Sequence, residues 1–305
     1  MDSEIEMINE SYRKIQEHPC YSEKAQHRFG RMHLPVAPKC NIQCNYCVRK
    51  YDCVNESKPG ITSKVLTPQE ALDRTREVIG RHHFIKVIAV AGPGEPLFNE
   101  ETFETYRLVK EAFPYLMLCG STNGLLLPDK ADILKELGLS HITVTINAVS
   151  PEVAEKIYSF IIFEGKRYEG IEAATLLLEN QWKGLEKAVK LGMLVKVNTV
   201  YIPSINEDEI PRIGELAGQK GVIMQNIMPL IPQYKFSHLR PPTPGERVGM
   251  QEKCRPYAKQ MTHCRQCRAD ACGLLGKDLI NERASEDKGK GGELRCKVEK
   301  ICEVG

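Results

Sequence analysis

The stretch CNIQCNYCVRKYDC, residues 40–53, places four cysteines within fourteen residues. Cys40, Cys44 and Cys47 have the tight spacing C-x3-C-x2-C, and Cys53 lies six residues further on. The residues between them are largely polar, which argues against a role as small buried hydrophobic residues. Because a reducing cytosol keeps structural disulfides rare, cysteines grouped at such short intervals are typical of metal or cluster ligands.

The chain of 305 residues is nearly neutral, with 42 Lys and Arg against 40 Asp and Glu and a net charge of +2. This balance argues against a dominant electrostatic attraction to nucleic acid or to an acidic membrane surface. The polar N-terminus lacks the apolar stretch of a signal peptide, and no apolar run approaches the ~20 residues of a membrane helix. We therefore expect a cytoplasmic protein without nucleic-acid or membrane partners.

Apolar segments rich in β-forming residues alternate with helical patterns along the chain. Helix starts are indicated by Thr67-Pro68, with Glu70 placed to complete a capping box, and by Ser150-Pro151. A further helix has apolar residues at three-to-four spacing over 174–192. Six strands alternating with helices predict parallel βαβ units, in either an open doubly wound sheet or a partial barrel. The predicted strands lie near 33–38, 84–91, 115–120, 141–147, 194–202 and 222–230.

Residues suited to chemistry follow several of these strands at the point where each strand ends. The three closely spaced cysteines follow the first strand, and the glycine-rich AGPGEP, residues 91–96, follows the second. Cys119 and STNG, residues 121–124, close the third strand, and Asn147 closes the fourth. Because parallel strands end at one rim, these residues predict a single pocket there. We predict an α/β fold, a partial (β/α)6 TIM-like barrel, with this pocket at its mouth.

The predicted barrel does not account for the whole chain. It would occupy residues 33–232, preceded by an N-terminal extension, 1–32, that covers the barrel mouth. A C-terminal segment that begins with a proline-rich loop, 233–283, contains further cysteines and is expected to bind a cluster. The last residues, 284–305, mix charge and glycine and are expected to form a mobile tail.

Three thiolates on one short loop are an awkward zinc site, because structural zinc wants four ligands, usually from two separated pairs. A 4Fe–4S cube, by contrast, can be held on three of its irons by three thiolates, which leaves the fourth iron open. The open iron would then bind a chelating group of a substrate. The spacing of Cys40, Cys44 and Cys47 therefore favours an iron–sulfur cluster over zinc.

With aromatic Tyr46 before its last cysteine, the triplet resembles the signature of the radical S-adenosylmethionine (SAM) superfamily. The resemblance implies that Cys40, Cys44 and Cys47 hold a catalytic 4Fe–4S cluster whose open iron is chelated by SAM. It implies that one electron from this cluster breaks SAM and yields a 5′-deoxyadenosyl radical. AGPGEP is similar to the GGEP motif of that superfamily, which contacts the methionyl amine. By the same resemblance we expect SAM contacts from Gly92, Gly94, Glu95, Ser121, Asn123, Thr145, Asn147 and Asn198.

Two longer stretches, residues 18–57 and HCRQCRAD at 263–270, resemble the NifB family of nitrogenase cofactor biosynthesis proteins. This resemblance covers nearly the whole chain and implies two further 4Fe–4S clusters, which serve as substrates. It implies an enzyme that fuses the pair, inserts a carbon from a SAM methyl group and adds a sulfur. The implied product is an 8Fe–9S–carbide precursor of the nitrogenase cofactor.

The first substrate cluster is expected on cysteines that the triplet leaves out. Cys53 is too far along the loop to share the triplet's cube, Cys119 leaves the third strand, and Cys20 lies in a segment able to reach the rim. An imidazole is expected as fourth ligand; the resemblance implies His33, with His27 as the alternative. The predicted strand 33–38 starts at His33, away from the rim, which leaves a structural role open for this histidine.

The second substrate cluster is expected on Cys264 and Cys267, although such a C-x2-C pair beside a histidine also suits zinc. The resemblance matches these two cysteines, and Cys272 or Cys254 is held as a possible third ligand. Few protein ligands suit a cluster that has to leave its site. No general base for deprotonating the methyl group is assigned, although Glu56 and Glu95 lie near the right loops.

The implied partners are cluster-donating proteins, an electron donor such as ferredoxin or flavodoxin, and a carrier or scaffold protein of nitrogenase cofactor maturation that receives the product. Two other functions stay open. One is a radical SAM enzyme with auxiliary electron-transfer clusters that acts on a peptide or nucleotide. The other is a zinc-binding protein without catalytic activity.

Overall fold

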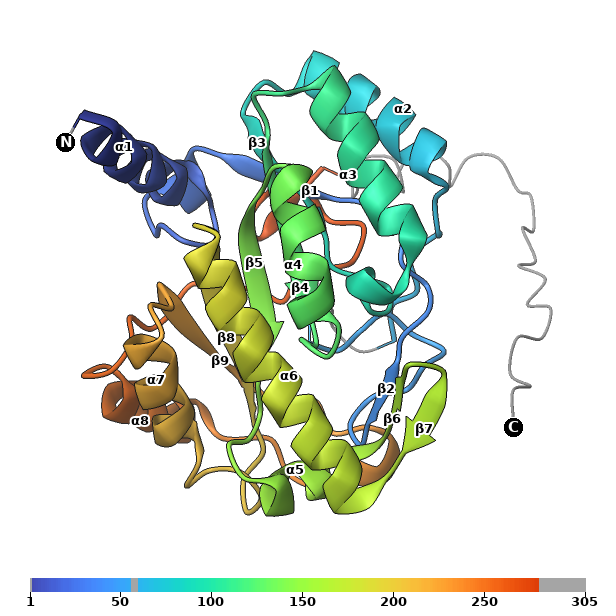
Figure 1. The fold of residues 1–305 in the computed structure, drawn as a ribbon, viewed down its shortest axis with the longest axis vertical. Coiled ribbons are helices and arrows are strands. Elements are labelled where there is room, and N and C mark those ends of the chain that lie inside the picture. The colour runs from blue at the N-terminus through green and yellow to red at the C-terminus, as the bar shows by residue number, and fades with distance from the viewer. Residues whose placement is uncertain (1, 56–59, 280–305) are drawn as a thin grey trace.

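Six parallel strands form the centre of the molecule (Figure 1). Their order in the sheet, β1-β3-β4-β5-β8-β9, follows their order along the chain. A doubly wound sheet would reverse direction at a switch point, so the sequential order is that of a barrel wall and confirms the predicted fold. The computed structural model describes residues 2–55 and 60–279, so the predicted tail 284–305 and Glu56 lie outside the described residues. The strands are β1 (Gly30–His33), β3 (Ile85–Val90), β4 (Met117–Thr122), β5 (Leu139–Thr145), β8 (Leu194–Tyr201) and β9 (Met224–Pro229).

Helices cover the outer face of this sheet. The predicted capping box at the start of α2 is confirmed: the Glu70 amide donates to Thr67 Oγ1 at 3.2 Å, and the Thr67 amide donates to Glu70 Oε2 at 2.8 Å. The helix predicted over 174–192 is α6, which begins earlier, at Gly170. The helices are α1 (Asp2–Glu17), α2 (Pro68–Arg81), α3 (Glu100–Ala112), α4 (Leu127–Glu136), α5 (Pro151–Ile157), α6 (Gly170–Lys190), α7 (Ile210–Gln219) and α8 (Pro244–Cys254), with short 3-10 turns at Ala25–His27, Pro96–Phe98 and Tyr234–Phe236.

The two faces of the sheet differ in character, because successive side chains of a strand point to opposite sides. Ile88, Leu118 and Val144 belong to the main hydrophobic core between the sheet and the helices. Ala89 lies opposite Cys119, and Ser121 lies opposite Thr143, on the other face. The interior of the barrel is thus lined by small, polar and sulfur-containing side chains. None of the helices in the described part of the chain has the length and apolar character needed to cross a membrane.

The first strand was predicted at 33–38, and this prediction is wrong. The observed strand, β1, ends at His33, which lies opposite Ala89 of β3. Pro35 and Pro38 lack the amide hydrogen that a ladder needs, which explains why the strand does not continue through them. His33 therefore lies at the carboxyl end of its strand.

A short hairpin and a separate three-stranded sheet, neither of which was predicted from the sequence, add to the barrel. A hairpin of β10 (Cys272–Leu274) and β11 (Lys277–Asp278) pairs with β1 and extends the main sheet. Among the strands of the described residues β9 pairs with β8, and its Gln225 also forms an isolated parallel bridge with Gln260, so the ladder stays open between β9 and β11. A separate sheet joins β2 (Ile42–Cys44), β6 (Tyr158–Phe163) and β7 (Lys166–Tyr168).

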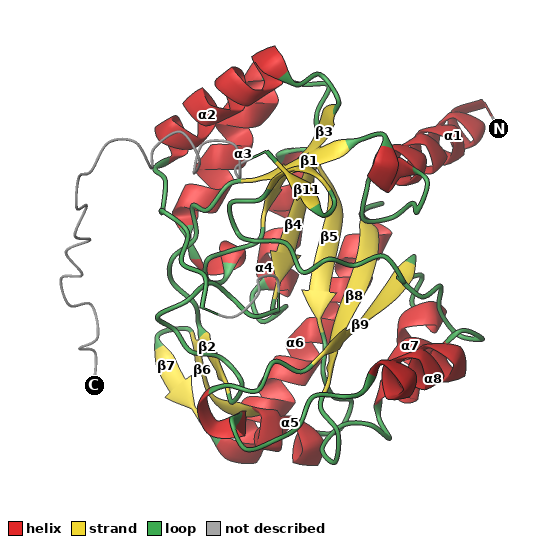
Figure 2. Cartoon of the chain, turned by 180° about the vertical axis from the view of Figure 1, so that it is seen from behind, coloured by secondary structure: helices red, strands yellow, loops and turns green. Residues whose placement is uncertain are grey.

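The N-terminal extension lies at the opposite end of the barrel from β2, β6 and β7 (Figures 1 and 2). The Tyr21 hydroxyl donates to the carbonyl of Leu194, the first residue of β8, at 3.0 Å. The His18 ring packs against His141, near the start of β5, with ring centroids 4.3 Å apart. The prediction that this extension covers the barrel mouth is therefore corrected: it packs where strands begin.

Candidate functional site

A cavity opens at the rim where the parallel strands end. We call it the outer cavity. It brings together the cysteine loop, the turn after β3 and the ends of β4 and β5, as the sequence predicted. Its lining includes Cys40, Cys44, Cys47, Arg49, Cys53, Asn55, Ala91, Gly94, Glu95, Ser121, Asn123 and Thr145.

Hydrogen bonds of the backbone shape the cysteine loop. Cys44 ends β2 and lies opposite Tyr158 of β6, and the Asn45 amide donates to the Ile157 carbonyl at 2.8 Å. The Gln43 side-chain amide donates to the carbonyls of Cys44 and Cys47, both at 2.9 Å. The loop is therefore held in one shape by protein contacts, as a preorganised ligand site requires.

The positive charge of Arg49 acts on all three thiols of the cysteine loop. Its guanidinium donates to the Ile42 carbonyl and, through Nε, to Gln43 Oε1 at 3.2 Å. Burial raises the pKa of Cys40 and Cys47, and the positive charge of Arg49 lowers it in part. Since thiolates are the form that binds metal, these thiols need the charge of a bound cluster to lose their protons. The donor set of three thiols on one loop suits a 4Fe–4S cluster.

The AGPGEP turn packs directly on the chain that enters the cysteine loop. Gly94 and Glu95 donate their amides to the carbonyls of Ala37, at 2.6 Å, and Lys39, at 2.8 Å. A Cβ atom at Gly94 would lie 2.3 Å from the Lys39 carbonyl oxygen, so only glycine fits there. The two motifs are thus joined by backbone contact one residue before Cys40.

Glu95 links the same turn to the end of β4. Its carboxylate accepts hydrogen bonds from the Thr122 hydroxyl at 2.5 Å, the Asn123 amide at 2.7 Å and the Leu97 amide at 3.1 Å. Burial raises the pKa of this carboxyl to about 7, although these donors lower it in part. The side chain lines the outer cavity, but its oxygens are engaged by neighbouring protein groups, which gives it a positioning role toward Asn123.

A second cavity lies deeper in the barrel. We call it the inner cavity. It shares Asn55, Ala91 and Ser121 with the outer cavity. Cys119 and Ser121 are two residues apart on β4 and so point to the same face, with Cys119 further from the rim. The potential ligands in its lining come from four separate parts of the chain: Cys20, His33, Cys119, Cys264 and Cys267.

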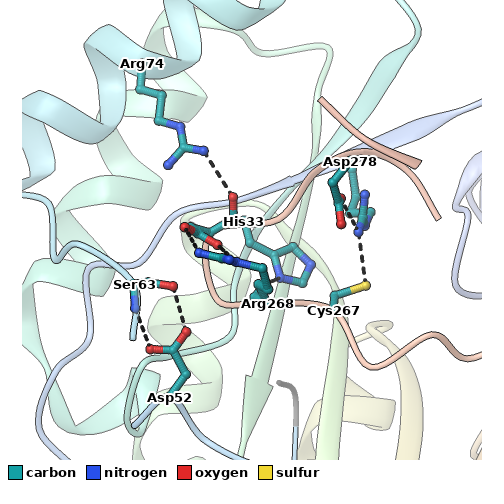
Figure 3. A network of polar contacts seen from close by, with 9 residues as sticks. His33, Asp52, Ser63, Arg74, Cys267, Arg268 and Asp278 are labelled. Carbon is teal, nitrogen blue, oxygen red and sulfur yellow. Dashed lines mark hydrogen bonds and ion pairs between the residues drawn. The ribbon is translucent and has the colours of Figure 1, made fainter. Parts of the chain in front are cut away.

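His33 is buried in the wall of the inner cavity (Figure 3). Its Nδ1 lies 3.0 Å from the Arg268 carbonyl oxygen, so the proton on this nitrogen is fixed and Nε2 is the nitrogen suited to metal. Burial lowers the pKa of His33 to about 3, which keeps the imidazole neutral at pH 7. His27 is exposed and does not line this cavity. The structure thus brings His33, and not His27, to the predicted cysteines.

The thiol of Cys267 and the carboxylate of Asp278, both labelled in Figure 3, interact with the guanidinium of Arg31. Its guanidinium is 1% exposed, lies 3.2 Å from Cys267 Sγ and pairs with Asp278 at 2.8 Å. Burial raises the pKa of Cys267 to about 12, and the charge of Arg31 lowers it in part. Sequence reasoning missed Arg31 and the neighbouring wall residue Lys196. The available signal was a charged residue inside a predicted strand, as with Lys196 in LVKVNTVY of β8.

Several predicted site residues are not where the sequence suggested. Cys53 lines the outer cavity with the triplet, and not the inner cavity with Cys20 and Cys119. Asn198 lines the inner cavity, away from the other predicted SAM contacts. Asn147 lines neither, because its amide nitrogen donates to the hydroxyls of Tyr46 and Tyr158 and its oxygen accepts from the Val200 amide.

Neither proposed third ligand of the Cys264 and Cys267 pair reaches a cavity. Cys254 is fully buried among the apolar side chains of Tyr201, Ile210, Ile227 and Met250. Cys272, on β10, packs into the main hydrophobic core. Both are corrected to core residues. Over residues 2–55 and 60–279, no three His, Cys, Asp or Glu side chains converge as they would around one metal ion.

Comparisons with known proteins agree with this geometry. The family model of the Radical SAM superfamily matches residues 34–217. The FeMo cofactor biosynthesis protein NifB of Herbaspirillum seropedicae is 44% identical over 292 residues, 93% of this chain and 56% of that protein. NifB of Bradyrhizobium diazoefficiens is 47% identical over 280 residues, 90% of this chain and 56% of that protein. The chain thus spans little more than half the length of these curated relatives.

A solved structure with the same fold is that of Streptococcus suis SuiB bound to S-adenosylmethionine. Its TM-score is 0.55 and its sequence identity 11%, over 75% of this chain and 48% of that one. At this identity the likeness concerns the fold alone.

Proposed function

Because the chain belongs to the radical SAM superfamily and is a homologue of NifB proteins, we propose that it builds the iron–sulfur core of the nitrogenase cofactor. In this proposal it fuses two 4Fe–4S clusters, inserts a carbon from a SAM methyl group and adds a sulfur. The product is an 8Fe–9S–carbide cluster. The two substrate clusters enter and leave as cargo, whereas the triplet cluster stays with the chain.

One observation carries the proposal: a cavity with three cysteines on one loop adjoins a second cavity with four more cysteines and a neutral histidine. The two share the wall formed by Asn55, Ala91 and Ser121. A species formed at the rim would therefore have a short path to clusters deeper in the barrel.

In the outer cavity, Cys40, Cys44 and Cys47 would hold the resident cluster. When bound, this cluster supplies the electron that cleaves SAM to methionine and a 5′-deoxyadenosyl radical. Gly94, Asn123 and Thr145 line the same space. Glu95 holds the Asn123 backbone at this position through the hydrogen bond of 2.7 Å.

In the inner cavity, Cys20, His33 and Cys119 would hold one cargo cluster and Cys264 with Cys267 the other. Cys53 lines the outer cavity close to Asn55, which belongs to the wall that both cavities share. We infer that it supplies the remaining ligand of the cluster at Cys20, His33 and Cys119. Arg31 would favour the thiolate form of Cys267, which is the form that binds iron, through its positive charge and its hydrogen bond to the sulfur. Few ligands per cluster suit cargo that must fuse and depart.

The proposed partners follow from this chemistry. Cluster-donating proteins would supply the cargo, a ferredoxin or flavodoxin the electrons, and a separate carrier or scaffold protein of nitrogenase cofactor maturation would receive the product. These proteins and this chain would meet in the cytoplasm.

The proposal is tested by turnover with SAM labelled with ¹⁴C in its methyl group. Anaerobic protein loaded with iron and sulfide would be mixed with labelled SAM and reductant, and the protein-bound iron–sulfur fraction counted. We expect label in that fraction and loss of the spectroscopic signals of the cargo clusters. Intact cargo clusters and no retained label would point instead to auxiliary electron-transfer clusters serving a peptide or nucleotide substrate.

A further inference from the structure

Two buried histidines, His18 and His33, line the inner cavity and differ in what faces their Nδ1 atoms. The Nδ1 atom of His33 lies 3.0 Å from a carbonyl oxygen, that of Arg268. The Nδ1 atom of His18 instead accepts a hydrogen bond from the backbone amide of Cys20 at 3.1 Å. The backbone therefore offers an acceptor to one imidazole and a donor to the other.

This contrast decides the tautomer of each ring, because a neutral imidazole carries one proton, on Nδ1 or on Nε2. In His33 the carbonyl accepts the proton of Nδ1, so Nε2 keeps a free lone pair and can bind iron. In His18 the Nδ1 atom accepts the amide proton and carries none of its own, so the proton of the ring is on Nε2. The Nε2 atom of His18 is therefore a hydrogen-bond donor and not a metal ligand.

Within the described part of the chain, no hydrogen-bond partner reaches Nε2 of His18, although the residue is only 1% exposed. A buried donor without a partner costs free energy, and such groups are rare in folded proteins. The residues that line the inner cavity include four more with an unpartnered buried atom: Arg31 Nε, Asn55 Oδ1, Asn226 Oδ1 and Gln266 Nε2. So many such groups around one internal space indicate a polar occupant.

The ring of His18 is fixed by aromatic neighbours as well as by its hydrogen bond. Its centroid lies 4.8 Å from that of Tyr21 and 4.3 Å from that of His141, near the start of β5. Tyr21 directly follows Cys20, whose amide the same ring accepts. The imidazole is thus held rigidly next to a predicted ligand of the cargo.

An iron–sulfur cluster suits such a donor, because its sulfurs accept hydrogen bonds and these bonds help to set its reduction potential. We propose that His18 is a cargo-binding residue: its Nε2–H donates a hydrogen bond to a sulfur of the cluster held by Cys20, His33 and Cys119. This inference rests on the proposed function. The two histidines of the inner cavity have different tasks, since His33 binds iron and His18 binds sulfur.

The test uses the full chain with the triplet cysteines replaced by alanine, so that iron is retained in the inner cavity alone. In this background His18→Asn, His18→Gln and the control His141→Phe are reconstituted anaerobically with iron and sulfide. Asn offers the Cys20 amide an acceptor near the position of Nδ1 but is too short to replace the Nε2 donor, whereas the amide of Gln reaches that position. His141 is a similarly buried histidine that lines neither cavity.

Three properties are measured: the midpoint potentials of the retained clusters, the coordinating-nitrogen signal in pulsed electron paramagnetic resonance, and the unfolding of the metal-free protein. We expect His18→Asn to make one potential more negative, by a tenfold change in the one-electron equilibrium or more, equivalent to about 59 mV. The nitrogen signal should persist, because it comes from His33. His18→Gln should recover at least half of the shift, and His141→Phe should show none. Metal-free His18→Asn should be as stable as its parent, since the Cys20 amide keeps an acceptor.

Several results would overturn the inference and leave the proposed function intact. Unchanged potentials in His18→Asn, or no recovery in His18→Gln, would mean that the Nε2 donor does not act on the cluster. An equal shift in His141→Phe would indicate a general effect of burying fewer polar rings. Loss of the nitrogen signal in His18→Asn would make His18 a ligand, and a metal-free His18→Asn protein that is destabilised or unfolded would make it structural. If the background with His18 intact retains no iron at all, the proposed function itself fails, and the inference fails with it.

Discussion

The outer and inner cavities adjoin in one barrel but are built in different ways. The outer cavity is built mainly from three short segments: the 40–47 loop, the 91–96 turn and the 121–124 segment. Within each segment the lining residues are close together in sequence, and each segment is placed by the end of one strand. The inner cavity draws its potential ligands from residues 20, 33, 119, 264 and 267, which meet only after the whole chain has folded.

This difference suits the two chemical tasks that we propose for the chain. A resident cluster needs a rigid site, and Gln43, Arg49 and the pairing of β2 with β6 fix the cysteine loop by direct hydrogen bonds. Cargo needs a site that can form and open, and ligands on separate segments allow this. A site built from short segments and a site built from residues far apart in the sequence should therefore respond differently to substitution. This difference gives several ways to test the comparison.

The largest expected effect is that of His33→Ala, which removes a proposed ligand of the inner cavity and leaves the outer cavity untouched. Retained SAM-methyl carbon should be lost while SAM cleavage continues, because cleavage needs only the triplet. His27→Ala, on the exposed side of the same segment, is the matched control and should retain label. The opposite pattern between the two histidines would make His27 the imidazole ligand.

The next largest effect is expected on the pH dependence of the free energy of unfolding, to which Glu95 in the outer cavity contributes. Burial raises its pKa from 4.5 to about 7, so the folded state holds a proton that the unfolded chain has lost between these pH values. Stability should therefore fall as pH rises from 4.5 to 7, by up to about 3 kcal/mol relative to Glu95→Gln. Chemical denaturation of both proteins at several pH values measures this, and parallel pH profiles would contradict it.

Gly94→Ala should have a somewhat smaller effect, again confined to the outer cavity. Its new Cβ would meet the Lys39 carbonyl at 2.3 Å, and relieving that contact should cost about 1–3 kcal/mol of stability. SAM affinity should fall as well, because the cysteine loop must shift. Gly80→Ala in α2, where no atom lies within 4 Å of the added Cβ, is the control and should be neutral or slightly stabilising.

The smallest effect on clusters is expected for Cys254→Ala. The thiol lies in an apolar pocket, and burial raises its pKa to about 11, so it should not bind iron. Iron content should match the parent protein, with a modest loss of stability from the small cavity. The variant for comparison is Cys267→Ala, which should lose iron. An equal loss of iron in Cys254→Ala and Cys267→Ala would indicate that Cys254 is a ligand after all.

Sequence reasoning located the outer cavity well because its signals are local. The spacing of the triplet, the glycines of AGPGEP and the STNG segment follow strand ends that periodicity reveals. Its errors also have physical causes. Pro35 and Pro38 end β1 earlier than its apolar pattern suggests, and that shift decides the place of His33.

The inner cavity was only partly predictable from the sequence, because tertiary contacts decide which residues line it. Cysteines look alike in sequence, yet Cys254 and Cys272 pack into apolar clusters whereas Cys264 and Cys267 line the cavity. The strands of the sheet β2, β6 and β7 and of the hairpin β10 and β11 are too short to be recognised from the periodicity of their apolar residues. The partnership of Arg31 with Cys267 spans 236 positions and has no local signal.

The most direct test of two separate cluster sites is the iron and acid-labile sulfide content of the anaerobic protein before and after removal of Cys40, Cys44 and Cys47. We expect about three cubes per chain, falling to about two in the triplet variant, with the inner clusters unchanged by spectroscopy. A single cube in the parent, or loss of all iron on removing the triplet, would contradict the presence of independent cargo sites in the barrel.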